Sequence, residues 1–214
     1  MTSVTPPRRR TPSDDVEQAL LDAAADVLTT EGPAALSVRR VAADAGVSPM
    51  GVYSRFGGKH GLVEALFLDG FRRLEEHLAV SRTGDPLADL RECCRGYRRF
   101  ALASPAAYSV MFARAVPGFV PSAPCRVDAA GAFQVVVELV RVALDASALR
   151  PGDPVDLAEG IWATCHGLVS LELAGIGFVP DREAHFDGIT AALLRGLATD
   201  PTDGQARRAT RKRS

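Results

Sequence analysis

Residues 36–62 read LSVRRVAADAGVSPMGVYSRFGGKHGL, and this stretch decides the fold. Ser37 and Ser48 each stand where a hydroxyl group can cap the start of a helix. Pro49 suits the first helical position, because proline lacks the N–H that would be left unbonded there. Gly46 permits the left-handed backbone that turns a chain between two helices. The pattern therefore predicts two short helices joined by a tight turn, which is a helix-turn-helix.

The apolar residues of this stretch recur at helical spacing and predict one small core. They are Val41, Ala42, Val47, Val52 and Phe56. The residues between them on the second helix then face outward together: Ser48, Met50, Gly51, Tyr53 and Ser54. An outward-facing helix of this size fits the major groove of DNA, which admits one α-helix.

The polar residues of this region suit the DNA backbone, because phosphates bind cations, hydroxyl groups and helix N-termini. We expect phosphate contacts from six of them: Ser37, Arg39, Arg40, Ser48, Tyr53 and Lys59. Each also has a purely structural interpretation. The serines can be caps alone, the tyrosine an aromatic ring at the edge of the core, and the lysine a solvated charge. Taken together at these spacings, they favour DNA binding.

The rest of the chain also has helical periodicity. Asp85-Pro86, Ser104-Pro105 and Asp153-Pro154 repeat the cap-then-proline start signal, and no segment alternates as a strand would. Residues 115–124 read as a loop. About nine helices in succession predict an all-α protein. We expect a basic arm over 1–12, a helix-turn-helix domain over 13–60, a larger helical domain over 61–199 and a basic tail over 200–214, both ends being disordered.

Composition sets further limits. Of the 214 residues, 47% are hydrophobic, and the net charge is −1. Basic residues gather at both ends of the chain and around residues 36–62. No apolar run follows the basic N-terminus or approaches membrane-spanning length, so we expect a cytoplasmic protein. The cysteines are expected to be reduced core thiols: Cys93, Cys94, Cys125 and Cys165. No spacing of acidic, histidine or cysteine residues predicts a metal or another cofactor.

Residues 36–67, LSVRRVAADAGVSPMGVYSRFGGKHGLVEALF, resemble the DNA-binding region of TetR-family transcriptional regulators. That family shows a Ser/Thr-led second helix, an A-x-x-A-G-V-S turn, a V/L-Y-x-x-F recognition helix and then G-x-K-x-x-L. The resemblance is ordered over residues 13–70. It implies phosphate contacts from Ser37, Ser48, Tyr53 and Lys59. It also implies that four residues lie nearest the bases: Pro49, Met50, Gly51 and Ser54.

The recognition helix departs from the family at Gly51, where a threonine or another small contacting residue is common. Residues 49–51 offer no side chain that can form two hydrogen bonds with one base. Specificity can then rest on Arg39 or Arg40, on contact of Met50 with thymine methyl groups, or on DNA shape. The PPRRRTP arm can enter a minor groove or remain a solvated tail.

A second stretch, IWATCHGLVSLEL over residues 161–173, is similar to a subgroup of TetR-family C-terminal domains known by its Trp-His-Gly (WHG) residues. Trp162 and His166 are one turn apart and share a helix face. They can line a ligand cavity. Alternatively, Trp162 anchors the core while His166 hydrogen-bonds a neighbour.

The family resemblance implies a small-molecule pocket in the middle helices and a homodimer formed through the last two long helices, about 155–175 and 183–197. Candidate pocket residues are Phe71, Tyr97, Tyr108, Met111, Phe112, Phe119, Phe133, Trp162 and His166. Any of them can instead be ordinary core. Their apolar character favours an uncharged aromatic or aliphatic ligand.

The function that these features predict is a dimeric DNA-binding repressor that an apolar ligand releases from its operator. A DNA-binding regulator without a small ligand is the main alternative. An all-α carrier or enzyme is a second alternative, but no nucleophile has an evident partner. Cys165 and His166 are adjacent in sequence and cannot face each other on one helix. We therefore expect no enzymatic activity.

Overall fold

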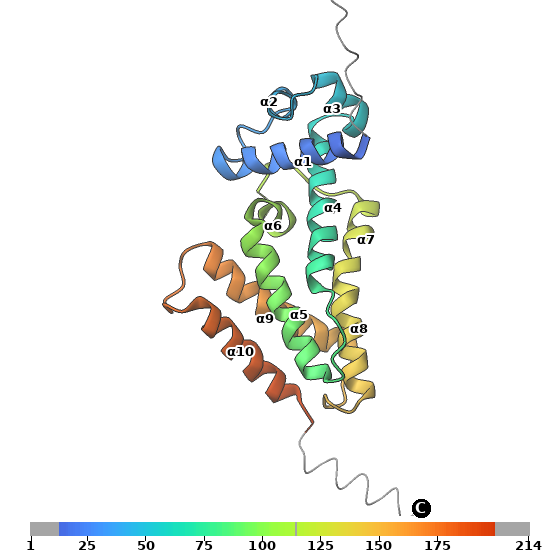
Figure 1. Ribbon diagram of the computed structural model, residues 1–214, viewed down its shortest axis with the longest axis vertical. Coiled ribbons are helices and arrows are strands. Elements are labelled where there is room, and N and C mark those ends of the chain that lie inside the picture. Colours follow the sequence, from blue (N-terminus) through green and yellow to red (C-terminus); the bar gives the residue numbers. More distant parts are fainter. Residues whose placement is uncertain (1–12, 114, 200–214) are drawn as a thin grey trace, which may run out of the picture. The chain divides into compact units, whose positions relative to one another are not determined.

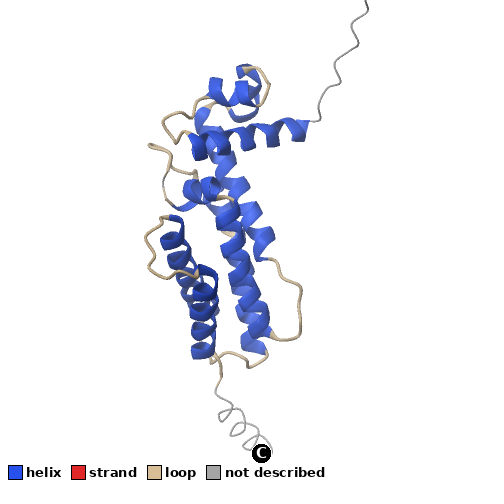
Figure 2. Cartoon of the chain, turned by 60° about the vertical axis from the view of Figure 1, so that its left-hand side comes forward, coloured by secondary structure: helices blue, strands red, loops and turns tan. Residues whose placement is uncertain are grey.

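The computed structural model describes residues 13–113 and 115–199, and these fold into helices joined by loops, with no strand among them (Figure 2). The all-α class is confirmed. The predicted arm and tail lie outside the described residues. The helices are α1 (Ser13–Thr30), α2 (Val38–Asp44), α3 (Pro49–Phe56), α4 (Lys59–Leu78), α5 (Pro86–Ala103), α6 (Pro105–Phe112), α7 (Ala123–Ala129), α8 (Gly131–Asp145), α9 (Pro154–Leu173) and α10 (Arg182–Leu197) (Figure 1).

The described residues contain ten helices where the sequence predicted about nine. The additional helix is α7, which begins at Ala123, inside the segment 115–124 that was predicted to be a loop. It is two turns long and buries only Cys125 and Ala129. Two buried positions are too few to produce a recognisable apolar stripe.

The chain divides into two compact units whose boundary falls inside α4. The first unit comprises the described residues through Leu68, together with Ala106–Ser122. The second comprises Asp69–Pro105 and the described residues from Ala123 onward. The first unit thus joins the start of α4 and most of α6 to the first three helices. The domain bounds expected from the sequence stay a prediction.

In the first unit, α2 packs between α1 and α3. Val41 and Ala42 of α2 and Val52 of α3 are fully buried, while Val47 and Phe56 are half-buried. Burial of Val41 and of Val52 contributes roughly 1.5–3 kcal/mol each. Two helices this short need such packing, because isolated helices of their length are unstable. The predicted small core is therefore present, and its centre is formed by Val41, Ala42 and Val52.

The turn between α2 and α3 depends on Gly46. Its φ of +68° is left-handed, a region that side chains disfavour. In this conformation the Gly46 N–H donates to the Ala43 carbonyl at 3.1 Å and the Val47 N–H donates to the Ala42 carbonyl at 2.9 Å. These two bonds satisfy the last carbonyls of α2 and direct the chain into the cap of α3.

A second constraint lies where α3 passes into α4. Gly61, in the first turn of α4, approaches the backbone of Phe56 so closely that a Cβ at residue 61 would overlap the Phe56 carbonyl oxygen. Glycine therefore fixes the approach of the end of α3 to the start of α4.

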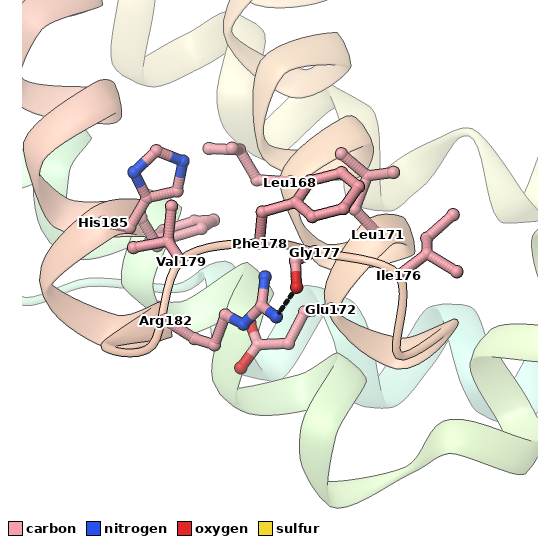
Figure 3. A pocket seen from close by; sticks show the side chains of 10 residues that line it. Leu168, Leu171, Glu172, Ile176, Gly177, Phe178, Val179, Arg182 and His185 are labelled. Atoms are coloured by element: carbon pink, nitrogen blue, oxygen red, sulfur yellow. Dashed lines mark hydrogen bonds between the residues drawn. The ribbon is translucent and has the colours of Figure 1, made fainter.

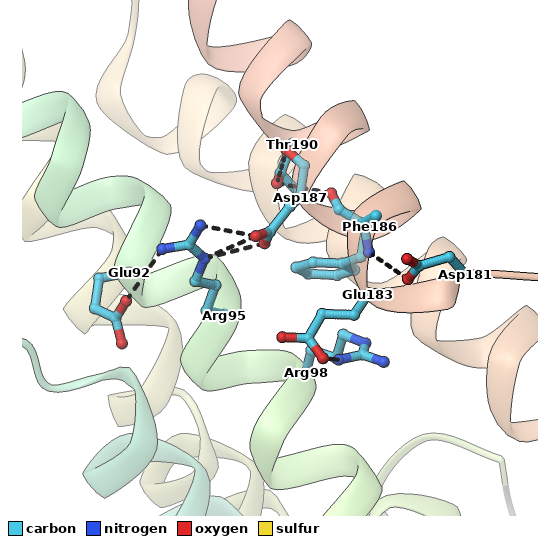
Figure 4. A network of polar contacts seen from close by, with 9 residues as sticks. Glu92, Arg95, Arg98, Asp181, Glu183, Phe186, Asp187 and Thr190 are labelled. Carbon is cyan, nitrogen blue, oxygen red and sulfur yellow. Dashed lines mark hydrogen bonds and ion pairs between the residues drawn. The ribbon is translucent and has the colours of Figure 1, made fainter.

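The second unit is built on α5, which packs against α8, α9 and α10. Two arginines of α5 tie it to the last helices (Figure 4). The guanidinium of Arg95 binds both carboxylate oxygens of Asp187, the shortest distance being 2.7 Å. Arg98 binds both oxygens of Glu172 at 3.0 and 2.8 Å. Paired hydrogen bonds of this kind fix the orientation of both partners.

All four cysteines are buried, and none forms a disulfide with another described cysteine. Burial raises the pKa of the Cys93 thiol, so it stays protonated. The end of α10 is held by two backbone hydrogen bonds, from the Arg150 N–H to the Leu197 carbonyl and from the Thr199 N–H to the Ala148 carbonyl. Among the described residues, no helix is both long and apolar enough to cross a membrane.

Two glycine substitutions in the first unit test this packing. Gly61→Ala should lower the free energy of unfolding by about 1–3 kcal/mol, because a methyl group would overlap the Phe56 carbonyl. Gly51→Ala is the matched control, since its Cβ would meet Val47 at 3.8 Å, an ordinary contact. It should be neutral or stabilise by up to about 1 kcal/mol. Urea unfolding measures both, and equal effects would contradict the close approach.

Candidate nucleic-acid interface

The second helix of the helix-turn-helix, α3, has one buried and one exposed face. Val52 is 0% exposed, whereas Met50 is 70% and Tyr53 is 54% exposed. Ser54 is also exposed, and Gly51 is half-buried. Four of the five residues predicted to face outward from this helix are therefore exposed, and the fifth has no side chain.

Ser37 and Ser48 cap α2 and α3 as predicted. The Ser37 hydroxyl oxygen accepts from the Arg40 N–H and the Ser48 hydroxyl oxygen from the Gly51 N–H, both at 3.3 Å. Each hydroxyl group uses its oxygen in the cap and keeps its hydrogen for a further acceptor. Capping and a phosphate contact are therefore compatible in the same serine.

The two arginines of α2 differ in their surroundings. Arg40 forms ion pairs with Glu31 at 2.6 Å and Asp44 at 2.8 Å. Hydrogen bonds to Asp44 and Glu31 raise the pKa of Arg40, which stays charged. Its guanidinium is thus engaged by two carboxylates at the surface of the protein. Arg39 is exposed and has no ion pair with any described residue.

Two further cations flank α3. Lys59, the first residue of α4, is exposed and has no ion pair in the described part of the chain. The same holds for Arg55, in the last turn of α3, which the sequence argument did not include. Two residues along a helix correspond to about 200°, so Arg55 and Tyr53 lie on opposite flanks of α3. In the sequence, a search for basic residues on both flanks of the predicted recognition helix would have found Arg55.

Tyr53 is positioned by the turn after α3. A Cβ on Gly58 would lie 3.5 Å from Cε1 of the Tyr53 ring, which places the ring beside this turn. Tyr53 thus combines the two interpretations made from the sequence, because its ring rests on the fold while more than half of the side chain remains exposed.

The segment after α6 packs on the start of α4 within the same unit. The ring of Phe119 lies 5.5 Å from that of His60 and 6.1 Å from that of Phe67. The Ser122 N–H donates to the Glu64 carboxylate at 2.8 Å. This segment therefore supports the helix that follows the helix-turn-helix.

The nine candidate pocket residues are divided between the two units. Tyr108, Met111, Phe112 and Phe119 belong to the first unit, and Phe71, Tyr97, Phe133, Trp162 and His166 belong to the second. In the first unit, the rings of Tyr108 and Phe112 are 5.0 Å apart. Phe119 packs on α4, as described above.

Four residues of the second unit form an aromatic cluster. The Tyr97 hydroxyl lies 2.9 Å from Nδ1 of His166, at hydrogen-bond distance. The His166 ring is 5.8 Å from that of Trp162, which is 6.0 Å from Phe133. Burial lowers the pKa of His166 and favours the neutral imidazole. The predicted sharing of one helix face by Trp162 and His166 is confirmed.

A hollow of about 190 Å³ lies beside the loop between α9 and α10 (Figure 3). Its lining is mainly apolar, and Phe178 of the loop is fully exposed. Arg182 lies against the loop and donates to the Gly177 carbonyl. A shallower groove of about 490 Å³ runs beside Glu75 and Glu138. None of the nine candidate residues lines either hollow, and no described group of acidic, histidine and cysteine residues could hold a metal ion.

Two family profiles match the chain. Residues 20–66 match the profile of bacterial regulatory proteins of the tetR family, and residues 90–193 match that of the tetracyclin repressor-like C-terminal domain. The second match contains Trp162, His166 and Gly167, but assignment to the WHG subgroup stays a prediction. No curated protein matches the chain significantly.

Solved structures share the fold. A protein of unknown function from Rhodococcus sp. RHA1 has 26% identity and a TM-score of 0.75, covering 92% of this chain and 100% of its own. A TetR family transcription regulator from Marinobacter aquaeolei VT8 has 19% identity and a TM-score of 0.67, with coverages of 90% and 100%. NalD, the secondary repressor of the MexAB-OprM multidrug efflux pump in Pseudomonas aeruginosa, has 21% identity and a TM-score of 0.65, with coverages of 88% and 98%.

The profile matches occupy both the helix-turn-helix and the helices that follow it, in the order that the family shows. The matched N-terminal region contains both capped helices and the glycine turn between them. The chain therefore belongs to the TetR family of bacterial transcriptional regulators, whose members are DNA-binding regulators and not enzymes.

Proposed function

We propose that this regulator is a homodimeric repressor that binds a near-palindromic operator through α3 and leaves it when an apolar small molecule binds. The observation that carries the DNA-binding part is the exposed face of α3, which is flanked by cations without ion pairs and preceded by a serine cap. Because it acts on the chromosome, its proposed location is the cytoplasm. Repression is the function of NalD, one of the similar structures.

The proposed phosphate contacts come from both flanks of α3 and from α2. Tyr53 and Arg55 lie on opposite flanks of α3, and Lys59 follows at the start of α4. Arg39 and the hydroxyl groups of Ser37 and Ser48 contribute from the helix starts. Arg40 is kept from this set by its two carboxylate partners, which a phosphate would have to displace. Pro49, Met50, Gly51 and Ser54 are the residues proposed nearest the bases.

The proposed dimer forms through the outer faces of α9 and α10. Large apolar side chains are exposed there: Val155 and Leu171 on α9, Ile189 on α10, and Ile176, Phe178 and Val179 in the loop between them. The same two helices carry exposed glycines, at Gly160, Gly167, Gly188 and Gly196. Exposed apolar surface of this extent is typical of an interaction site, and small residues permit close helix packing.

The proposed ligand contacts are the candidate residues of each unit taken separately. In the first unit they are Tyr108, Met111, Phe112 and Phe119, and in the second they are Phe71, Tyr97, Phe133, Trp162 and His166, with the Tyr97–His166 pair as the polar part of the second set. Aromatic rings with one hydrogen-bonded pair suit an apolar ligand that carries a single polar group. Such a ligand releases DNA only if it binds one conformation of the dimer better than the other. A regulator without a ligand would keep its DNA affinity in every small-molecule screen, so release of DNA by an apolar compound separates the two alternatives.

Selection of bound duplexes from a random DNA pool, at two salt concentrations, tests the function. We expect one inverted-repeat motif whose half-site centres lie about 34 Å apart, one turn of the double helix. Affinity should fall steeply with salt, because each neutralised phosphate releases counterions. Binding that is insensitive to salt, or that yields no motif, would contradict sequence-specific recognition through α3.

Substitutions of basic residues in α2 and α4 test the assignment of phosphate contacts. Arg39→Ala and Lys59→Ala should weaken binding to all sequences and reduce the slope of log K against log salt by about one per protomer. Arg40→Ala is the matched control and should leave that slope unchanged, because its charge is already paired with Glu31 and Asp44. A loss of slope with Arg40→Ala would show that Arg40 leaves these carboxylates for the DNA.

A charge placed on α10 tests the dimer. Ile189 is exposed, so Ile189→Asp should leave each subunit folded while preventing burial of this face against a second copy. Sedimentation should then change from a dimer to a monomer, with unchanged helical circular dichroism. Val120→Asp, an exposed apolar residue of the first unit, is the control and should remain dimeric. A dimeric Ile189→Asp protein would place the interface elsewhere.

A further inference from the structure

The outward face of α3 has few free hydrogen-bonding groups. The Ser54 hydroxyl donates its hydrogen to the Gly51 carbonyl at 3.1 Å. The Ser48 hydroxyl oxygen accepts from the Gly51 N–H in the cap. Pro49 has no N–H, and Gly51 has no side chain. Apart from the Ser48 hydroxyl hydrogen at the helix start, which is assigned to a phosphate, the centre of this face therefore lacks an uncommitted side-chain donor. The cations that α3 and its neighbours offer lie toward its flanks.

One side chain protrudes from the centre of this face. Met50 is 70% exposed and lies in the first turn of α3, the part of a recognition helix that usually meets the bases. Its thioether sulfur is only a weak hydrogen-bond acceptor, and the rest of the side chain is apolar. Met50 can gain from covering an apolar group, but it cannot read a donor-acceptor pattern.

The major groove presents one strongly apolar group, the methyl on C5 of thymine. Cytosine has a hydrogen at that position, and 5-methylcytosine has the same methyl group as thymine. The two pyrimidines otherwise differ at C4, where thymine has an acceptor oxygen and cytosine a donor amine. A methionine side chain discriminates weakly between these two groups.

We propose that Met50 reads the C5-methyl group of a pyrimidine in each half-site, so that this regulator accepts 5-methylcytosine where it accepts thymine. The inference rests on the proposed position of α3 in the major groove. It specifies what the helix recognises there, a methyl group and not a whole base. It also makes operator binding sensitive to cytosine methylation at that position.

The methyl group has a definite expected effect. Removing one buried methyl weakens a contact by about fourfold. Replacement of thymine by uracil at the Met50 position should therefore reduce affinity about fourfold in one half-site and about sixteenfold in both. With a C·G pair at that position, methylation of the cytosine should raise affinity by the same factors. In both comparisons the two duplexes differ only by the methyl groups.

The experiment begins with the motif from the random-pool selection. Each thymine of the half-site is replaced in turn by deoxyuridine and each cytosine by 5-methyldeoxycytidine, and the affinity of the full-length protein is measured at fixed salt. The series is repeated with Met50→Ala and Met50→Leu. We expect one methyl-sensitive position per half-site, which Met50→Ala loses and Met50→Leu keeps because leucine is also apolar.

Val120→Ala is the matched control, because Val120 is 67% exposed in the same unit but lies outside α3, and it should keep the wild-type pattern. The proposal is overturned if no position responds to the methyl group, or if the response persists in Met50→Ala. A motif and salt-sensitive binding would still be present in either case, so the failure is distinct from failure of the proposed function. Absence of any motif would instead overturn both.

Discussion

The helix-turn-helix depends on the left-handed backbone at Gly46. In this conformation the N–H groups of Gly46 and Val47 bind the last carbonyls of α2, and the cap of α3, Ser48, follows at once. The short turn brings Val41 and Val52 into one core. Burial of that core fixes which face of α3 points inward. The residues on the opposite face of α3 are then exposed. The exposed face is therefore a consequence of the turn, since α3 alone is too short to be stable.

The basic residues of this region differ in their electrostatic surroundings. The chain has a net charge of −1, so an attraction to DNA cannot come from its total charge. Arg40 holds α2 to the end of α1 through Glu31 and to its own last turn through Asp44. Arg39, the residue before it, has no such partner. Two neighbouring arginines thus differ in their surroundings, because only Arg40 faces the carboxylates of Glu31 and Asp44.

Local signals in the sequence were sufficient where the physics is local. The caps at Ser37, Ser48, Asp85 and Asp153 and the turn at Gly46 each involve groups within a few residues, and each is found where it was predicted. The pairing of Arg40 with Glu31 depends on where α1 ends relative to α2, which no local pattern encodes. The separation of the candidate pocket residues into two units has the same origin, because it follows from tertiary packing.

The position of Phe119 connects the two activities proposed for this regulator. The segment after α6 packs on α4 through Phe119 and through the Ser122 N–H, within the unit that contains α3. A displacement of this segment therefore changes contacts on the helix that follows the recognition helix by only two residues. Close packing makes such contacts change between discrete arrangements and not gradually. On the proposed function, a ligand that favours one arrangement of this segment also favours one arrangement of α4 next to the recognition helix.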